Sequence, residues 1–171
     1  MTISLVRRTI SRRLLSPGFQ SGVSISHETK TMLLTTYLNP QQIAALQAAV
    51  IRVIPKDDFP DGWEAGSGDF FAQLFAYEPR FLPTYQQGLD ALDAEAHAVS
   101  GQALSQMDTE AQDALLTRVE AGEVQTDWLL DPAEFFRLLV AQTLEGFYAD
   151  PGNGGNKDGV SWRMIGFTVT A

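Results

Sequence analysis

The sequence predicts an all-α fold: one helical domain of about five or six helices, with a flexible basic N-terminal arm and an irregular glycine-rich C-terminal tail. Apolar residues recur at spacings of three and four, and N-cap residues, prolines and glycines mark where these runs begin and end. No segment alternates polar and apolar residues for long enough to predict a sheet. We assign residues 1–36 to the arm and residues 37–171 to the domain.

The first helix is expected to begin after Asn39, a residue type favoured at the N-cap. Pro40 suits the first helical position, and Gln42 stands where a capping box takes Glu or Gln. Pro55 ends this helix. After a loop, the aromatic residues between 70 and 75 predict a short and buried second helix.

Three further helices follow from the same signals. The apolar spacing predicts one over residues 85–99, ended by Gly101, and another that starts at Asp108 and stops at Gly122. The last begins at Asp131, where proline and glutamate follow in register. It is apolar around more than half its circumference and should be central to the core. We expect its most buried residues to be Phe135, Phe136, Leu139 and Leu144.

Charge and composition exclude several classes of protein. The net charge is −9, although residues 1–27 contain four arginines and no acidic residue, so the domain itself is more acidic still. An acidic domain argues against nucleic acid as a partner, because phosphates would be repelled. No run of about 18 apolar residues is present, so no direct membrane span is expected. The absence of cysteine excludes disulfides and thiolate metal sites.

The arm contains two arginine pairs, Arg7-Arg8 and Arg12-Arg13, which are typical of a twin-arginine export signal. Such a signal also needs about 7–15 apolar residues after its charges, whereas Leu14 and Leu15 are followed at once by residues 16–22, Ser-Pro-Gly-Phe-Gln-Ser-Gly. A degenerate export segment, an organelle transit peptide and a flexible arm all remain open. We expect a cytoplasmic protein, or one at the periplasmic face of the inner membrane if it is exported with a partner.

Candidate chemistry is sparse. The glycine-rich loop at residues 152–159 lacks the spacing and the Ser/Thr of a P-loop, so a sharp reversal of the chain explains it better. The loop does not by itself explain why large apolar residues follow so soon after it. Asp90, Asp93 and His97 share one helical face, as metal ligands would, although a solvated Asp–His pair is the commoner arrangement.

Other sites are equally weak. The acidic loop over residues 57–64 fails the alternating pattern of a calcium-binding EF-hand, and its acids are better explained by local turns. With two histidines, no cysteine and no G-x-S-x-G elbow, a nucleophilic triad is hard to assemble. No dinucleotide-binding fingerprint is present. We therefore expect neither a catalytic site nor a cofactor in this chain.

The segment from Phe135 to Phe167, which includes Glu-Gly-Phe-Tyr-Ala-Asp-Pro-Gly-Asn-Gly-Gly-Asn-Lys-Asp and Trp162, resembles the C-terminal signature of the gluconate 2-dehydrogenase subunit 3 family. Four earlier stretches come in the family's order, so that the resemblance covers about residues 37–167. They are Leu38-Asn-Pro-Gln-Gln, Val53-Ile-Pro-Lys-Asp, Tyr85-Gln-Gln-Gly-Leu-Asp-Ala-Leu and Gln112-Asp-Ala-Leu-Leu. One departure is Asn153, where the family usually has an aromatic residue.

The resemblance implies a small, non-catalytic subunit that pairs with a large flavin-dependent dehydrogenase acting on a sugar, sugar acid or polyol. FAD is then expected in the large subunit, and a multihaem cytochrome subunit often accepts the electrons. The small subunit of this family is thought to assist folding and export of its partner. We expect the signature to supply the partner-binding residues: Glu145, Tyr148, Asp150, Pro151, Gly154, Gly155, Asn156, Lys157, Trp162 and Ile165.

Two alternatives stay open. One is an independent helical enzyme with a carboxylate–histidine metal site at Asp90, Asp93 and His97. The other is a free-standing helical chaperone that binds the large subunit only transiently.

Overall fold

The computed structural model describes residues 33–167, which form six α-helices joined by loops and short 3-10 turns, with no strand in this range. The all-α prediction is confirmed. Residues 1–32, and with them nearly all of the predicted arm, lie outside the described part, as do residues 168–171. The helices are α2 (Pro40–Val53), α3 (Ser67–Tyr77), α4 (Leu82–Ser100), α5 (Thr109–Glu120), α6 (Pro132–Tyr148) and α7 (Val160–Ile165). The 3-10 turns are η3 (Leu34–Thr36), η4 (Pro79–Phe81), η5 (Leu104–Gln106), η6 (Pro151–Asn153) and η7 (Lys157–Gly159).

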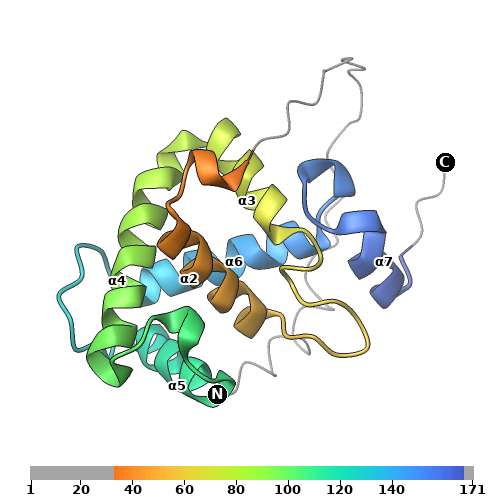
Figure 1. Ribbon diagram of the computed structural model, residues 1–171. Coiled ribbons are helices and arrows are strands. Elements are labelled where there is room, and N and C mark those ends of the chain that lie inside the picture. The colour runs from red at the N-terminus through yellow and green to blue at the C-terminus, as the bar shows by residue number, and fades with distance from the viewer. Residues whose placement is uncertain (1–32, 168–171) are drawn as a thin grey trace. The chain divides into compact units, whose positions relative to one another are not determined.

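Helix α6 runs through the middle of the domain and contacts α2, α3, α4, α5 and α7 (Figure 1). Helix α4 lies along one side, α5 packs below α2 and α6, and α7 lies at the end of α6 away from α4 (Figure 1). The turn η3, which was predicted as part of the arm, packs against α2 and α3. None of the helices between residues 33 and 167 is both long enough and apolar enough to cross a membrane.

The helix starts follow from the predicted capping residues. Asn39 accepts a hydrogen bond from the backbone N–H of Gln42, whose side chain accepts one in return from the N–H of Asn39, so the capping box is complete. Asp108 and Asp131 cap α5 and α6 in the same way, each accepting from the N–H three residues on. Gly101, at φ 73°, ends α4 in the left-handed conformation that glycine allows.

An aromatic cluster forms the centre of the core. The rings of Phe71, Phe75 and Phe135 lie 5.3, 5.2 and 5.8 Å from the ring of Tyr85, so that α3, α4 and α6 meet around one buried tyrosine. Gly88 allows this approach, because a Cβ at that position would lie 2.3 Å from the Phe135 ring. Aromatic rings at these spacings add about 0.5–1.5 kcal/mol per pair beyond burial.

Burial along α6 departs from the prediction at one position. Phe135, Phe136 and Leu139 are buried as expected, whereas Leu144 is only half-buried. The last turns of α6 contribute Phe147, which is fully buried, to a second, smaller cluster. Leu144 lies at the edge of that cluster, which periodicity alone does not reveal.

The glycine-rich tail contains a short helix that the sequence did not predict. After α6 the chain forms η6, η7 and the short helix α7. Left-handed residues separate these turns: Gly154 at φ 87°, Asn156 at 46°, Asp158 at 57° and Gly159 at 66°. Because each such residue breaks a right-handed helix, the segment becomes a series of short helical pieces.

Candidate functional site

The candidate site is residues 149–167, here called the C-terminal segment, which contains most of the predicted partner-binding residues. It turns away from α6 at Asp150, whose carboxylate accepts from the N–H of Gly152 at 2.8 Å. The chain then reaches the start of α3 at Gly154. A Cβ on Gly154 would lie 2.8 Å from the carbonyl carbon of Asp69, and one on Gly66 would lie 2.9 Å from the Gly154 oxygen. The two backbones therefore touch, which requires glycine on both sides.

The next residue makes an even closer approach to α6. A Cβ on Gly155 would lie 2.0 Å from the carbonyl oxygen of Gly146, so no larger residue fits without moving the segment. Gly146 is itself packed against Phe70, because a Cβ on Gly146 would lie 2.7 Å from that ring. The N–H of Lys157 donates to the carbonyl oxygen of Ala65 at 2.8 Å. The glycines of the signature thus seat the segment on its own domain.

Asn156 joins the end of α6 to the start of α7. Its side chain is buried, where the amide nitrogen donates to the carbonyl oxygen of Ala149 at 2.8 Å and Oδ1 accepts from the N–H of Ser161 at 2.9 Å. Its left-handed backbone, φ 46°, is one that asparagine tolerates better than most residues. A second link comes from Trp162, whose indole N–H donates to the carbonyl oxygen of Tyr148 at 3.1 Å.

The ten predicted partner-binding residues divide by burial. Gly155 and Asn156 are buried and make their contacts within this chain, so the structure gives them no direct access to a partner. The exposed ones are Glu145, Asp150, Lys157 and Ile165, and the half-buried ones are Tyr148, Pro151, Gly154 and Trp162. Partner binding by these residues stays a prediction.

Phe167 and Arg163 are among the exposed residues of the segment that were not selected as partner-binding from the sequence. Phe167 is 49% exposed, and its ring packs edge-on against Trp162 at 5.2 Å, while the neighbouring Arg163 is exposed as well. The signal that could have found Phe167 is the dense run of large apolar residues after the glycine-rich loop, in which it follows Ile165 by two positions. Ile165 is itself 58% exposed. Ile165 and Phe167 together form a small exposed apolar surface at this end of the domain.

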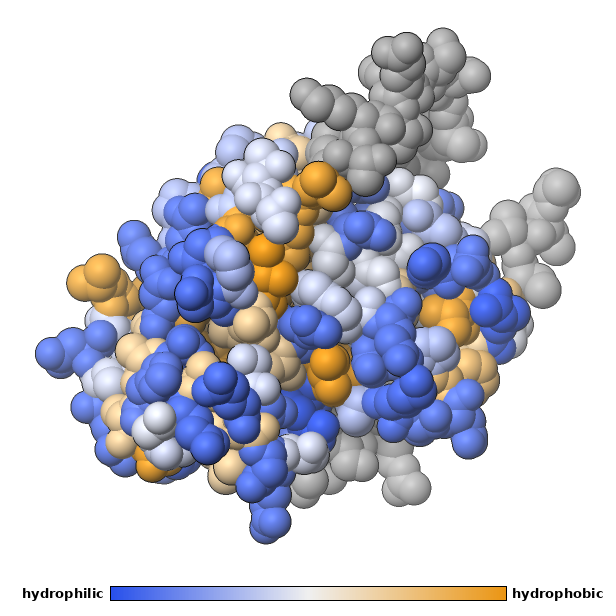
Figure 2. All heavy atoms as spheres, in the orientation of Figure 1, coloured by the Kyte–Doolittle hydropathy of each residue, from blue (hydrophilic) through white to orange (hydrophobic). Residues whose placement is uncertain are grey.

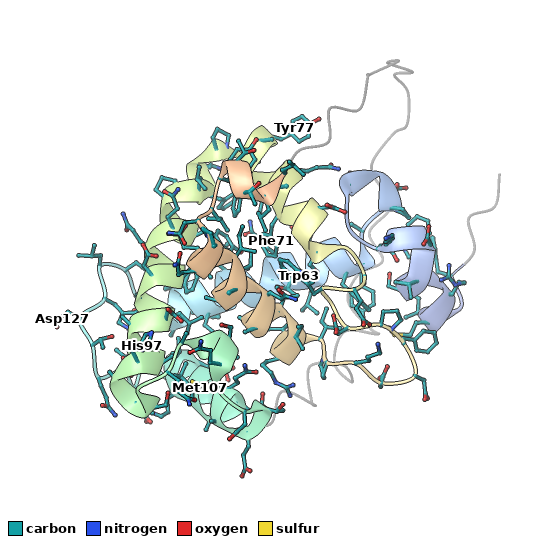
Figure 3. The ribbon with its side chains drawn as sticks, in the orientation of Figure 1. Trp63, Phe71, Tyr77, His97, Met107 and Asp127 are labelled. Carbon is teal, nitrogen blue, oxygen red and sulfur yellow. The ribbon has the colours of Figure 1, made fainter. Side chains whose placement is uncertain are left out.

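The residues proposed as metal ligands do not form a site. Asp90 accepts from the side-chain amide of Gln42 at 2.9 Å, whereas Asp93 accepts from the N–H of Leu104 at 2.9 Å. His97 lies on α4 at the side of the domain away from α7, 3.8 Å from the Asp93 carboxylate (Figure 3). Within residues 33–167 no three His, Asp or Glu side chains are placed to hold a metal ion.

The acidic loop is used for local structure. Asp61 accepts from the N–H groups of Trp63 and Glu64, both at 2.8 Å, and so fixes the turn before α3. Lys56 and Glu64 pair at 2.7 Å on the surface; their hydrogen bond raises the pKa of Lys56 and lowers the pKa of Glu64. These carboxylates are committed to a turn and an ion pair, which does not support a calcium site.

A shallow hollow of about 270 Å³ lies beside the C-terminal segment, since Gly66 and Asp69 of its lining approach Gly154. Leu34, Ile43 and Trp63 form its apolar walls, and among the described residues that line it Asp69 is the one titratable group (Trp63 is labelled in Figure 3). The described lining thus contains no pair of titratable groups of the kind that general acid–base catalysis uses.

Fold and site together define a class: an all-α domain whose glycine-rich segment is folded onto its own helices and ends in an exposed apolar patch. The family model of gluconate 2-dehydrogenase subunit 3 matches residues 40–168, and the chain belongs to this family. The resemblance noted in the sequence is thereby confirmed. Searches of curated proteins and of solved structures gave no match to the chain.

Proposed function

We propose that the chain is the non-catalytic small subunit of an FAD-dependent dehydrogenase complex that oxidises a sugar, a sugar acid or a polyol. In this proposal it stabilises the large flavin subunit and assists its maturation, and the FAD belongs to that large subunit. The observation that carries the proposal is the family match over residues 40–168, since the family is named for a subunit of a dehydrogenase. A multihaem cytochrome subunit is a further partner that the proposal allows.

The geometry supports a binding role over a catalytic one. The signature segment is held to the domain by backbone contacts at Gly154 and Gly155 and by the two hydrogen bonds of Asn156. These contacts leave Ile165 and Phe167 exposed at one end. Exposed apolar groups that are fixed in place are typical of protein–protein interfaces.

The test is affinity purification of the tagged full-length chain from its native host. We expect a flavin-containing large subunit to copurify in stoichiometric amount, and the complex to reduce an electron-accepting dye when sugar, sugar acid or polyol is added. The chain purified alone should hold no flavin and reduce no dye. Dye reduction by the chain alone at the rate of the complex would contradict the proposal.

The same purification separates the alternatives. A chaperone that binds transiently would be released once the large subunit has acquired its flavin, whereas a true subunit stays bound. A stoichiometric metal in the isolated chain would favour the independent enzyme. Fractionation of the host tests the two compartments considered, the cytoplasm and the periplasmic face of the inner membrane.

A further inference from the structure

We propose that the large subunit docks end-on, at the end of this domain that α7 forms. We further propose that the surface of the large subunit in this contact is an apolar depression surrounded by carboxylates. The surface on this chain, here called the α7 patch, consists of Lys157, Trp162, Arg163, Ile165 and Phe167. The inference rests on the proposed function, because it names the surface and the chemistry by which that partner is held.

The apolar part of the patch is ready to be buried. Ile165 is 58% exposed, Phe167 is 49% exposed, and the Phe167 ring packs edge-on against Trp162. The indole N–H of Trp162 already donates to the carbonyl oxygen of Tyr148. A partner can therefore cover the indole ring without leaving a buried, unpaired donor, which would weaken binding.

The patch is also fixed before any partner arrives. The N–H of Phe167 donates to the carbonyl oxygen of Trp162 at 2.8 Å and ends α7, while Asn156 holds the start of α7 to the end of α6. Binding then loses little conformational entropy, because these groups need not be ordered at that moment. Gly155 and Asn156 are buried and hold the patch to the rest of the domain, so we do not place them in the contact with the partner.

Charge selects the kind of partner. Residues 33–156 contain nineteen acidic residues and five basic ones, but this balance reverses over residues 157–167, where Lys157 and Arg163 outnumber Asp158. Both basic side chains are exposed. In Figure 2 a hydrophobic patch ringed by hydrophilic residues lies over the part of the domain where Figure 1 places α7. An acidic surface would be attracted there and repelled elsewhere, so charge favours the end-on orientation.

One other exposed apolar residue serves as a control. Leu129 is 88% exposed on the loop between α5 and α6, where Asp127 marks the side of the domain far from α7 (Figure 3). Its neighbours Trp128 and Leu130 are half-buried against the core, so Leu129 is the exposed residue of this short apolar run. Single exposed apolar residues of this kind are ordinary. Leu129→Ser therefore removes a comparable exposed side chain outside the α7 patch.

The first experiment measures binding of full-length variants to the flavoprotein that copurifies with the wild-type chain. Ile165→Ser combined with Phe167→Ser should weaken the affinity about tenfold or more, mainly through faster dissociation, at an unchanged melting temperature. Leu129→Ser should leave the affinity unchanged. Wild-type affinity in the double serine variant, or an equal loss in Leu129→Ser, would overturn the α7 patch.

The second experiment changes only the charge of the patch, and it tests docking at α7 even if the serine variant proves less stable than wild type. Lys157→Glu combined with Arg163→Glu should slow association about tenfold at low salt and flatten its dependence on ionic strength. The matched control, Lys56→Glu with Arg137→Glu, makes the same change of charge outside the patch and should have little effect. Equal slowing in both pairs would reject a partner with an acidic rim.

The outcome also separates this inference from the proposed function. If the wild-type chain retains no flavoprotein at all, the proposed function fails. If it binds the flavoprotein but none of the α7 variants weakens or slows that binding, the proposed function stands and only the docking surface is wrong.

Discussion

Glu95 is a buried carboxylate on α4 that organises the loop between α5 and α6. Its side chain is 2% exposed, and it accepts hydrogen bonds from the N–H groups of Gln125 and Thr126 and from the Thr126 hydroxyl, all at 2.8–3.0 Å. Arg118 lies 3.5 Å away and adds a positive charge. Burial alone would raise the pKa of Glu95, but the hydrogen bonds and Arg118 outweigh it and lower this pKa below its ordinary value.

The lowered pKa predicts a dependence of stability on pH. A carboxyl group whose pKa is lower in the folded state contributes stability above its unfolded pKa, near 4.5, and loses it as the pH falls through the folded pKa. Glu95→Gln should therefore cost about 2–4 kcal/mol at pH 7, because an amide donor would face two N–H groups. The difference from wild type should shrink below about pH 4, as urea unfolding at both pH values would show.

The control is Glu120→Gln, which removes an exposed carboxylate from α5 and should change the unfolding free energy by about 0.5 kcal/mol or less. Two outcomes would refute a stabilising role of the ionised Glu95 carboxylate. One is an equal change in unfolding free energy for Glu95→Gln and Glu120→Gln, and the other is a difference between Glu95→Gln and wild type that grows as the pH falls.

Asn156 provides a second test at the scale of one residue. Asn156→Ala removes a donor and an acceptor that are both used, leaves the carbonyl of Ala149 and the N–H of Ser161 unpaired, and keeps a backbone at φ 46° that alanine disfavours. We expect a loss of about 2–4 kcal/mol in the free energy of unfolding. Asn153→Ala, at an exposed asparagine of the same segment, is the control and should be nearly neutral. Equal stability of the two variants in urea would show that the two hydrogen bonds of the Asn156 side chain contribute nothing to stability.

The C-terminal segment is coupled to α6 and α3 by backbone contact, because Gly154 and Gly155 have no side chains to keep the backbones apart. The Gly155 backbone rests on the carbonyl oxygen of Gly146, and the Gly154 backbone rests on that of Asp69. Contacts of this kind have no tolerance for an added carbon atom, unlike contacts with the end of a flexible side chain.

A substitution at Gly155 tests that coupling. A Cβ 2.0 Å from the Gly146 oxygen forces the segment away from α6, so Gly155→Ala should cost about 3 kcal/mol or more. Faster amide hydrogen exchange should then appear in α7 while α2 and α4 keep their protection. Gly152→Ala is the matched control, since its Cβ would meet only the flexible Asp150 carboxylate at 3.1 Å. Uniform protection in Gly155→Ala would contradict the coupling.

The sequence predicted those helices whose ends are set by local chemistry. Asn39, Asp108 and Asp131 cap the residues that follow them, and an apolar stripe follows each, so local pattern and tertiary packing agree. It did not predict α7, because the start of that helix depends on Asn156 bonding to Ala149 and Ser161 at once. A run of Gly and Asn indicates turns but not which distant groups those turns will meet.

The candidate site shows the same division. Shared helical spacing correctly placed Asp90, Asp93 and His97 on one helix, yet Asp90 bonds to α2 and Asp93 to η5, so the three do not converge. Sequence grouped Gly155 and Asn156 with the partner-binding residues because they lie in one signature. Burial distinguishes residues that support a surface from residues exposed on it, and burial is known only once the chain is folded.

Charge is distributed unevenly over the whole described chain. Residues 33–156 hold nineteen acidic and five basic residues, and several of the basic ones are already paired, such as Arg52 with Asp113 at 2.7 Å. The loop around Asp127 and the neighbouring end of α5 contain Glu120, Glu123, Asp127 and Asp131 against one basic residue, Arg118. Repulsion among like charges lowers the stability of a compact state. Salt weakens this repulsion, because the Debye screening length falls from about 30 Å at 0.01 M to about 8 Å at 0.15 M ionic strength.

Stability of the full-length chain should therefore rise with ionic strength. We expect the melting temperature to increase by several degrees between about 10 mM and 300 mM NaCl at pH 7, because the excess of acidic residues outweighs the few ion pairs that salt weakens. Glu120→Gln combined with Asp127→Asn removes two exposed negative charges that hold no hydrogen bond of their own among residues 33–167. This variant should melt higher than wild type at 10 mM NaCl and respond less to added salt. A wild-type melting temperature that falls as NaCl is added would mean that ion pairs, not repulsion, dominate the electrostatics of the chain.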